Sequence, residues 1–310
     1  MEGKNMSFLH QLMFRILRSG KKDYDPNNLP DFVSQRAGEQ KIAKRIKAPV
    51  CLTIIQENGI QGELLSLEGK DPDRVIYYIH GGGFVAGSAE GRRGITAWLV
   101  RHSGCDVFSI NYRLAPEDPF PFGAQDCLKG YEMLLSRYSA DHICFMGDSA
   151  GANLVLSTVM QAQDKGLPLP ACVVPISPVV QFERELLSYT ANADTDCMIA
   201  GNILQEFRDL YLQREENWSH PYATVLNADL HQFPPTYLVA SEIECLRDDA
   251  VAFHQALLQA GRNSHLEMYP DLMHAFPILT MFPESKQALR KIVSFIETHL
   301  QPAADGNPYA

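Results

Sequence analysis

The stretch ICFMGDSAGANL, residues 143–154, joins a short apolar run to an amphipathic segment through one tight, glycine-containing turn. Residues 143–147 have the composition of a buried strand, and residues 150–164 have the spacing of a helix. The turn between them fits the pattern G-x-S-x-G, with Ser149 at its centre. Such a turn holds a serine hydroxyl clear of the sheet, and the N–H of Ala150 at the helix start can face developing negative charge. The stretch therefore predicts an α/β fold with Ser149 as a candidate nucleophile.

The same alternation of short apolar runs and longer amphipathic segments continues from about residue 50. The runs are rich in β-branched and aromatic residues and almost continuous in hydrophobicity, which is typical of strands buried on both faces of a parallel sheet. The predicted strands are residues 75–79, 106–110, 143–147, 172–177, 236–241 and 265–270. The predicted helices are residues 89–103, 124–137, 150–164, 247–260 and 284–299. This order predicts one doubly wound α/β sheet, mostly parallel, with helices on both faces.

Two segments do not follow this alternation. Residues 1–45 are charged and helical in character, and residues 181–232 separate two core strands by more than a plain connection needs. We interpret both as a layer added over one end of the sheet.

The composition argues against several classes of partner and cofactor. The 310 residues carry a net charge of −10 with no basic run, so nucleic acid is not an expected partner. The seven cysteines are scattered and form no C-x-x-C pair, which indicates reduced thiols in a cytoplasmic protein, without a disulfide framework or zinc site. No stretch approaches the ~20 apolar residues of a transmembrane helix, and the N-terminus lacks the apolar run of a secretory signal. We therefore expect no integral membrane association.

The N-terminal segment has the pattern of an amphipathic helix, because Leu9, Leu12, Met13, Ile16 and Leu17 recur at helical spacing. Packing of this helix on its own domain is favoured over a membrane-surface anchor, since the charge of its polar face is modest.

The glycine loop HGGGF, residues 80–84, directly follows the first long predicted strand. Glycines let backbone N–H groups approach a ligand closely, so Gly82 and Gly83 are the expected donors to an oxyanion. The loop and Ala86 also match G-x-G-x-x-A, the pattern of a nucleotide-phosphate loop. That alternative expects an acidic residue at the end of the next strand, where residues 111–113 read NYR. An oxyanion loop fits better.

A serine nucleophile needs a base, and position in the predicted fold separates the ten histidines. His274, in YPDLMHAFP, follows the end of the predicted strand 265–270. The others fall in predicted helices, at or before strand starts, in the glycine loop or in the added layer. Ligand-facing residues of doubly wound sheets lie beyond the carboxyl ends of strands. His274 is therefore the predicted general base.

Four sequence blocks, HGGGF, NYRLAPE, GDSAG and MHAF, together resemble the hormone-sensitive-lipase branch of α/β-hydrolase esterases over about residues 50–300. The resemblance implies carboxylesterase activity on short- to medium-chain acyl esters, with no metal or cofactor. It implies an oxyanion hole made by the N–H groups of Gly82, Gly83 and Ala150. It also implies that NYRLAPE is structural support, so Glu117 is assigned no chemistry.

The resemblance further implies a cap built from the N-terminal segment and an insertion after the sixth strand, which are the two segments that depart from the alternation. The predicted organisation is an N-terminal part of the cap at 1–45, a catalytic core in two parts at 46–180 and 233–300, a cap insertion at 181–232, and a disordered tail at 301–310.

The triad acid is expected in SEIECLRDD, residues 241–249. The family's loop usually reads D-P-L-x-D, and here Glu244 takes the acid position while Cys245 replaces the proline. Independently of that alignment, the acid must leave the end of a strand before the next helix begins, and Asp248 falls in the first turn of the predicted helix. Any ionised carboxylate can orient the histidine. Glu244 is favoured, with Asp248 and Glu242 as alternatives.

These observations predict a serine carboxylesterase that acts on a small-molecule ester through an acyl-enzyme. An amidase or lactonase would use the same constellation, and a non-catalytic small-molecule receptor could be built on the same scaffold. A homodimer is left open by the edge strand expected at residues 265–270, which could pair with a second copy.

Overall fold

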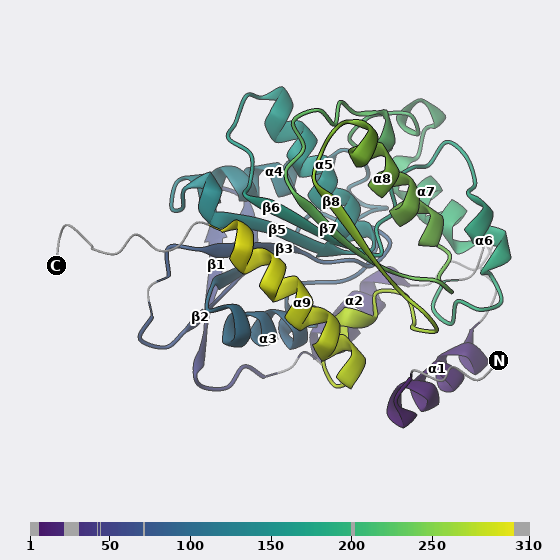
Figure 1. Ribbon diagram of the computed structural model, residues 1–310, viewed down its shortest axis with the longest axis horizontal. Helices are drawn as coiled ribbons and strands as arrows, with labels where there is room; N and C mark the ends of the chain where they lie inside the picture. The colour runs from purple at the N-terminus through teal and green to yellow at the C-terminus, as the bar shows by residue number, and fades with distance from the viewer. Residues whose placement is uncertain are drawn as a thin grey trace.

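In the computed structural model, which describes residues 6–21, 31–41, 43, 45–70, 72–199 and 202–300, eight strands form one sheet in the order β1-β2-β4-β3-β5-β6-β7-β8 (Figure 1). The strands are β1 (Val50–Glu57), β2 (Ile60–Leu67), β3 (Val75–Ile79), β4 (Asp106–Ile110), β5 (Ile143–Asp148), β6 (Cys172–Ile176), β7 (Thr236–Ser241) and β8 (Ser264–Tyr269). β2 pairs antiparallel with β1 and β4, and the remaining pairs are parallel. The predicted mostly parallel sheet is confirmed.

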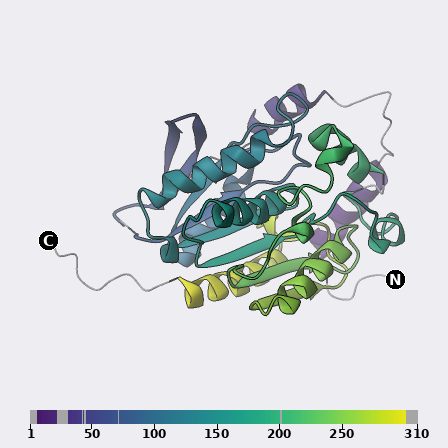
Figure 2. The ribbon, with the colours of Figure 1, turned by 90° about the horizontal axis from the view of Figure 1, so that it is seen from above.

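Helices cover both faces of this sheet, as the view from above shows (Figure 2). One face carries α3 (Arg93–Ser103) and α9 (Pro283–His299), and the other carries α4 (Phe122–Leu135), α5 (Ala150–Asp164) and α8 (Arg247–Gln259). The alternation of side chains along β3 builds the two cores. Tyr77 and Ile79 contact the helices of one face, whereas Ile76 and Tyr78 contact those of the other. All four side chains are fully buried, which explains the continuous hydrophobicity of the strand.

The six predicted strands all exist and agree with the structure to within one residue at each end. The β1–β2 hairpin was not predicted, because β1 is half exposed and its sequence is mixed. A signal for it is present in the sequence. Asn58 and Gly59 form the turn, both with positive φ, and Asn-Gly is the dipeptide preferred in two-residue hairpin turns. β8 lies at the edge of the sheet, as expected, and the homodimer that would use it stays a prediction.

The added layer contains α1 (Phe8–Gly20), α2 (Phe32–Lys41), α6 (Leu187–Ala191) and α7 (Ile203–Leu212). Short 3-10 turns lie at Glu90–Arg92, Ala140–His142, Glu215–Asn217, Val225–Asn227 and Phe276–Ile278. Residues of α2, α6 and α7 line the same cavity as the loops that follow β3 and β5. These three helices therefore lie over the carboxyl ends of the parallel strands. The insertion enters after β6, the sixth strand; its division from the core into domains stays a prediction.

Helix α1 packs on the core with one face only. At the start of α9, Glu284 accepts hydrogen bonds from the backbone N–H and the hydroxyl of Ser7. The His10 ring stacks on Phe282 with 4.6 Å between ring centroids. On the outer face Phe8 is 81% exposed. The expected packing of this helix on its own domain is confirmed for its inner face.

The described helices include none that is long and apolar enough to span a bilayer. All seven cysteines are free, and only Cys51 is exposed. The predicted tail at 301–310 lies outside the described residues, as do 1–5 and 22–30 of the predicted N-terminal segment.

Candidate active site

Ser149 occupies the turn between β5 and α5 in a conformation that an L-residue rarely adopts, with φ 55° and ψ −123°. Its backbone N–H donates to the carbonyl of Ile176 at 2.8 Å, which ties the turn to β6. A side chain at Gly151 would collide with the backbone carbonyls of Ile79 and His80, so the first turn of α5 can approach β3 only because this residue is glycine. The predicted G-x-S-x-G turn is present, and its strain is stored at the serine.

The serine lines a cavity of about 380 Å³ between the carboxyl ends of the parallel strands and the added layer. The core contributes the glycine loop, Ser149, Ala150 and His274 to its wall. The added layer contributes mainly apolar side chains, including Phe32, Phe182, Tyr189, Met198, Ile199, Ile203 and Phe207. A concave, mostly apolar site with a few convergent polar groups is the usual form of a small-molecule site.

The glycine loop forms the floor of this cavity next to Ser149. Gly83 has φ 62°, and a side chain there would lie 2.7 Å from the ring of Phe207 on α7. The carbonyl of Gly82 accepts hydrogen bonds from the N–H groups of residues 85 and 86. Among the described residues, none accepts a hydrogen bond from the N–H of Gly82, Gly83 or Ala150. These three donors line the cavity and are available to an anionic oxygen.

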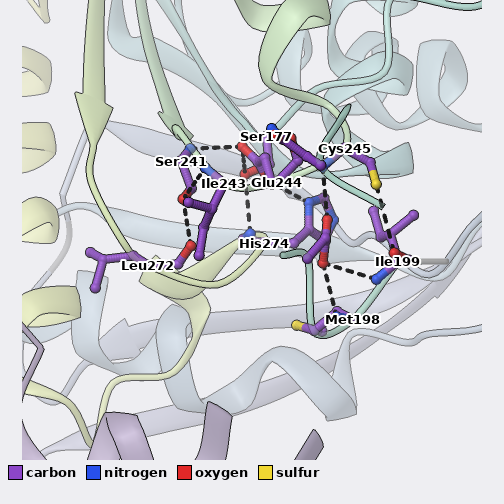
Figure 3. Close-up of polar contacts among 12 residues, drawn as sticks. Ser177, Met198, Ile199, Ser241, Ile243, Glu244, Cys245, Leu272 and His274 are labelled. Atoms are coloured by element: carbon purple, nitrogen blue, oxygen red, sulfur yellow. Dashed lines mark hydrogen bonds and ion pairs between the residues drawn. The ribbon is translucent and has the colours of Figure 1, made fainter. Parts of the chain in front are cut away.

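His274 follows β8 and contacts one carboxylate directly. Its Nδ1 lies 2.6 Å from Oε2 of Glu244, and both side chains are buried (Figure 3). Burial lowers the pKa of His274, but the hydrogen bond and charge of Glu244 more than offset this, so the pKa lies above its ordinary value of 6.5. Because a carboxylate accepts, Nδ1 carries the proton and Nε2 is the nitrogen that can take another.

The other acids of residues 241–249 do not contact His274. Glu242 is exposed. Asp248, in the first turn of α8, accepts from Arg247 Nε at 2.8 Å and from the Ser188 N–H at 2.9 Å. Asp249 is fully buried and accepts from the N–H of Val180, and its burial raises its pKa to about 8. The structure therefore brings only Glu244 of the four together with the histidine.

Two further groups, neither of them predicted from the sequence, hold Glu244. Oε1 accepts from the hydroxyl of Ser177 at 3.0 Å and from the backbone N–H of Ser241 at 2.8 Å (Figure 3). The Ser177 hydroxyl also accepts from the N–H of Ala275 at 3.1 Å, so it bridges the acid and the histidine loop. The sequence does contain an indication of Ser177. It is a polar residue directly after a buried strand, at the same carboxyl end of the sheet as Ser149.

Arg92, which was also not predicted from the sequence, supports the turn that contains Ser149. It donates to both oxygens of Asp148, at 3.0 and 2.8 Å, and Tyr78 donates to the same carboxylate at 2.7 Å. Burial alone would raise the pKa of Asp148, but the Arg92 charge and these hydrogen bonds hold it below its ordinary value. The residue next to the serine is therefore fixed as an ionised, fully paired group.

The NYRLAPE block lies under and beside the glycine loop. Tyr112 donates to the carbonyl of His80 at 2.9 Å and stacks on its ring. Glu117 accepts from Arg36 of α2 at 3.0 Å, and Arg36 also donates to the carbonyl of Val85 at 2.7 Å. These contacts tie the added layer to the loop. They give a structural account of Glu117, to which we assign no chemistry.

Within the described parts of the chain, no group of three or more His, Cys, Asp and Glu side chains could hold a metal ion.

The sequence matches the family described as alpha/beta hydrolase fold over residues 76–278. An acetyl-hydrolase of Streptomyces hygroscopicus is 32% identical over 230 residues, which cover 73% of this chain and 76% of that protein. An esterase of Acinetobacter venetianus is 29% identical over 239 residues, which cover 76% of this chain and 78% of that protein. A solved esterase from the bacterial hormone-sensitive lipase family is 30% identical with a TM-score of 0.87, covering 95% of this chain and 99% of its own.

Proposed function

Because the chain belongs to the alpha/beta hydrolase fold family and is similar to esterases of the hormone-sensitive lipase branch, we propose that it hydrolyses short- to medium-chain acyl esters through a Ser149–His274–Glu244 triad. The protein is a carboxylic ester hydrolase. The observation that carries the triad is the 2.6 Å contact between Glu244 Oε2 and Nδ1 of His274, because His274 lines the same cavity as Ser149.

The reaction follows from these positions. His274 Nε2 removes the proton of the Ser149 hydroxyl as Oγ attacks the ester carbonyl, and Glu244 stabilises the resulting imidazolium. The tetrahedral intermediate collapses when the imidazolium protonates the leaving alcohol. Water, deprotonated by the same histidine, then attacks the acyl carbonyl, and His274 returns the proton to Ser149 Oγ as the bond between Oγ and the acyl group breaks and the acid is released.

The developing oxyanion is held by backbone N–H groups. Gly82 and Gly83 donate from the glycine loop, and Ala150 donates from the start of α5, where the helix dipole favours negative charge. Each such donor contributes about 3 kcal/mol to the stability of the transition state. The two glycines can do so because no side chain stands between their N–H groups and the cavity.

The pH dependence of the reaction follows from the pKa of His274. The base acts only as neutral imidazole, and the Glu244 contact holds its pKa above 6.5. A raised pKa keeps the inactive, protonated form populated to higher pH. We therefore expect kcat/KM to fall as pH drops, with the midpoint of that acid limb above pH 6.5, in rate profiles measured from pH 5 to 9. A midpoint below pH 6 would contradict the buried Glu244–His274 pair.

The substrate class follows from the cavity and the layer over it. Side chains of α2 and α7 line the cavity together with the serine, which supports a small ester as the substrate in preference to a broad lipid surface. We expect kcat/KM to be highest for p-nitrophenyl esters of two to six carbons and at least about tenfold lower for the palmitate. Hydroxide-catalysed rates of the same esters serve as the control. Equal or higher kcat/KM for the palmitate would overturn the chain-length assignment.

Two alternatives use the same scaffold. If an amide and a lactone are assayed beside the p-nitrophenyl esters, an amidase or lactonase would turn over one of them faster than any ester. A non-catalytic receptor would leave Ser149 unreactive, so labelling of the folded protein by a fluorophosphonate separates it from the proposed enzyme. The N–H groups of Gly82, Gly83 and Ala150, which have no acceptor among the described residues, favour the enzyme, because a receptor has no need of an oxyanion hole.

A further inference from the structure

The loop that contains Glu244 is held by the added layer. The four consecutive carbonyls of residues 242–245 each accept a hydrogen bond from a side chain of residues 188–195. Asn192 Nδ2 donates to two of them at 3.0 and 2.8 Å, Thr195 donates to one at 3.0 Å, and Ser188 donates to one at 2.6 Å. The position of the acid is therefore set by a segment that belongs to neither the strand before it nor the helix after it.

Asp196 contacts both the loop that contains Glu244 and the wall of the cavity. Its side chain is 1% exposed, and Oδ2 accepts from the backbone N–H of Cys245, next to Glu244, at 2.9 Å. Oδ1 accepts from the N–H groups of Met198 at 2.8 Å and Ile199 at 3.0 Å. Both of these residues line the cavity, and the carbonyl of Ile199 lies 3.7 Å from Sγ of Cys245 (Figure 3). One buried carboxylate thus joins the cavity wall to the acid loop.

The donor at residue 245 exists because this chain has cysteine there. In the D-P-L-x-D pattern the corresponding residue is proline, which has no backbone N–H. A buried N–H without an acceptor is costly, so a chain with cysteine at this position needs an acceptor in the protein. The Asp196 carboxylate is that acceptor.

We propose that Asp196 is a positioning residue, which holds the acid loop and the cavity wall at Met198 and Ile199 as one unit and so keeps Glu244 in contact with His274. This inference rests on the proposed triad. Asp196 touches no reacting atom and acts through Glu244. It makes the geometry of the triad depend on the added layer as well as on the core.

The electrostatic surroundings of His274 support this role. Three carboxylates face the imidazole, from three different elements: Glu244, Asp196 and Asp148, and each raises the pKa of His274 against the effect of burial. Asp148 is paired with Arg92, and Glu244 makes the direct contact. Of the three, Asp196 is the one that neither contacts the imidazole directly nor is paired with Arg92.

The groups near Asp196 include two thiols and the cationic side chains of Lys21 and Arg18. Burial, with a contribution from Asp196, raises the pKa of Cys197 and of Cys245 to about 12, so both thiols are neutral. The ammonium of Lys21 donates to the backbone carbonyls of Ala193 and Asp196. Because Asp196 is one of the groups that raise the pKa of His274, removing its charge is expected to move the acid limb of the rate profile toward lower pH.

The test is the Asp196→Asn variant of the full chain, assayed with p-nitrophenyl butyrate from pH 5 to 9. Asparagine keeps the volume, but its NH2 group must face at least one of the three N–H donors, so at least one hydrogen bond is lost. We expect kcat to fall roughly tenfold with a smaller change in KM, and the acid limb to move to lower pH. Asp194→Asn is the matched control, because Asp194 is exposed, two residues away, and makes the same charge change. It should behave as wild type.

A wild-type kcat and acid limb in Asp196→Asn would overturn the inference, as would a lower melting temperature with an unchanged limb. If that variant does not fold, Asp196→Glu keeps the charge and displaces the carboxylate by one methylene. We expect it to retain the acid limb with a reduced kcat, and a wild-type kcat would overturn the inference.

Ser149→Ala, measured alongside, distinguishes a failure of the proposed esterase function from a failure of the role proposed for Asp196. An active Ser149→Ala enzyme would refute the proposed function. An inactive Ser149→Ala enzyme together with a wild-type Asp196→Asn enzyme would refute this inference alone.

Discussion

Replacing Ser149 by alanine is expected to lower kcat/KM for p-nitrophenyl butyrate by at least ~10⁴-fold while the protein stays folded. In the proposed mechanism the hydroxyl is the nucleophile, so without it no acyl-enzyme forms. The oxyanion donors and the cavity remain, and they leave only a residual acceleration. The variant should also lose labelling by a fluorophosphonate, measured by gel fluorescence or intact mass.

The matched control is Ser157→Ala, on the same helix α5. Ser157 is buried and accepts a hydrogen bond from Gln161 at 3.3 Å, away from the cavity. Its loss should affect stability slightly and leave kcat/KM near the wild-type value. Wild-type turnover by Ser149→Ala, with a labelled residue other than Ser149, would place the chemistry elsewhere in the chain.

The second large effect is expected from Glu244→Ala, which should lower kcat/KM by about 10³- to 10⁴-fold. The loss has two causes. Nδ1 of His274 loses the acceptor 2.6 Å away that fixes its tautomer, and the imidazolium formed in the reaction loses its counter-charge. Because the loss acts on the chemical step, kcat should carry most of it.

Asp248→Ala is the control, because it removes an acid four residues away that contacts Arg247 and the N–H of Ser188 and does not contact His274. Its kcat/KM should stay within about threefold of wild type, with a modest loss of stability from the first turn of α8. The reverse order of effects, a small loss in Glu244→Ala and a large one in Asp248→Ala, would show that the acid has been assigned to the wrong residue.

Much of the core could be predicted from the sequence, because its signals are local. The strands β3, β5 and β7 are buried on both faces, so their hydrophobicity is continuous and their bounds stand out. β1 has one exposed side and no such signature, and the hairpin it forms with β2 was missed although its Asn58-Gly59 turn is visible in the sequence. The difference between the two cases is how many faces of a strand the fold buries.

The supporting residues of the site could not be predicted in this way. Ser177 lies 67 residues from Glu244 in the sequence, Arg92 lies 56 from Asp148, and Asp196 lies 49 from Cys245. Each is a common polar residue without a motif around it. Each acts through a hydroxyl, a carboxylate or a guanidinium group that meets its partners only after separate elements have packed together.

The sequence by itself determined the type of sheet, the elbow at Ser149, the glycine loop and the histidine, because each is specified by a turn or by a strand end that a few neighbouring residues define. It favoured Glu244 as the acid and left Asp248 and Glu242 as alternatives. Only the tertiary structure brings one of them to the histidine, because the loops that follow β7 and β8 meet there and place the Glu244 carboxylate 2.6 Å from the imidazole. That distance is a property of packed elements, and no local pattern encodes it.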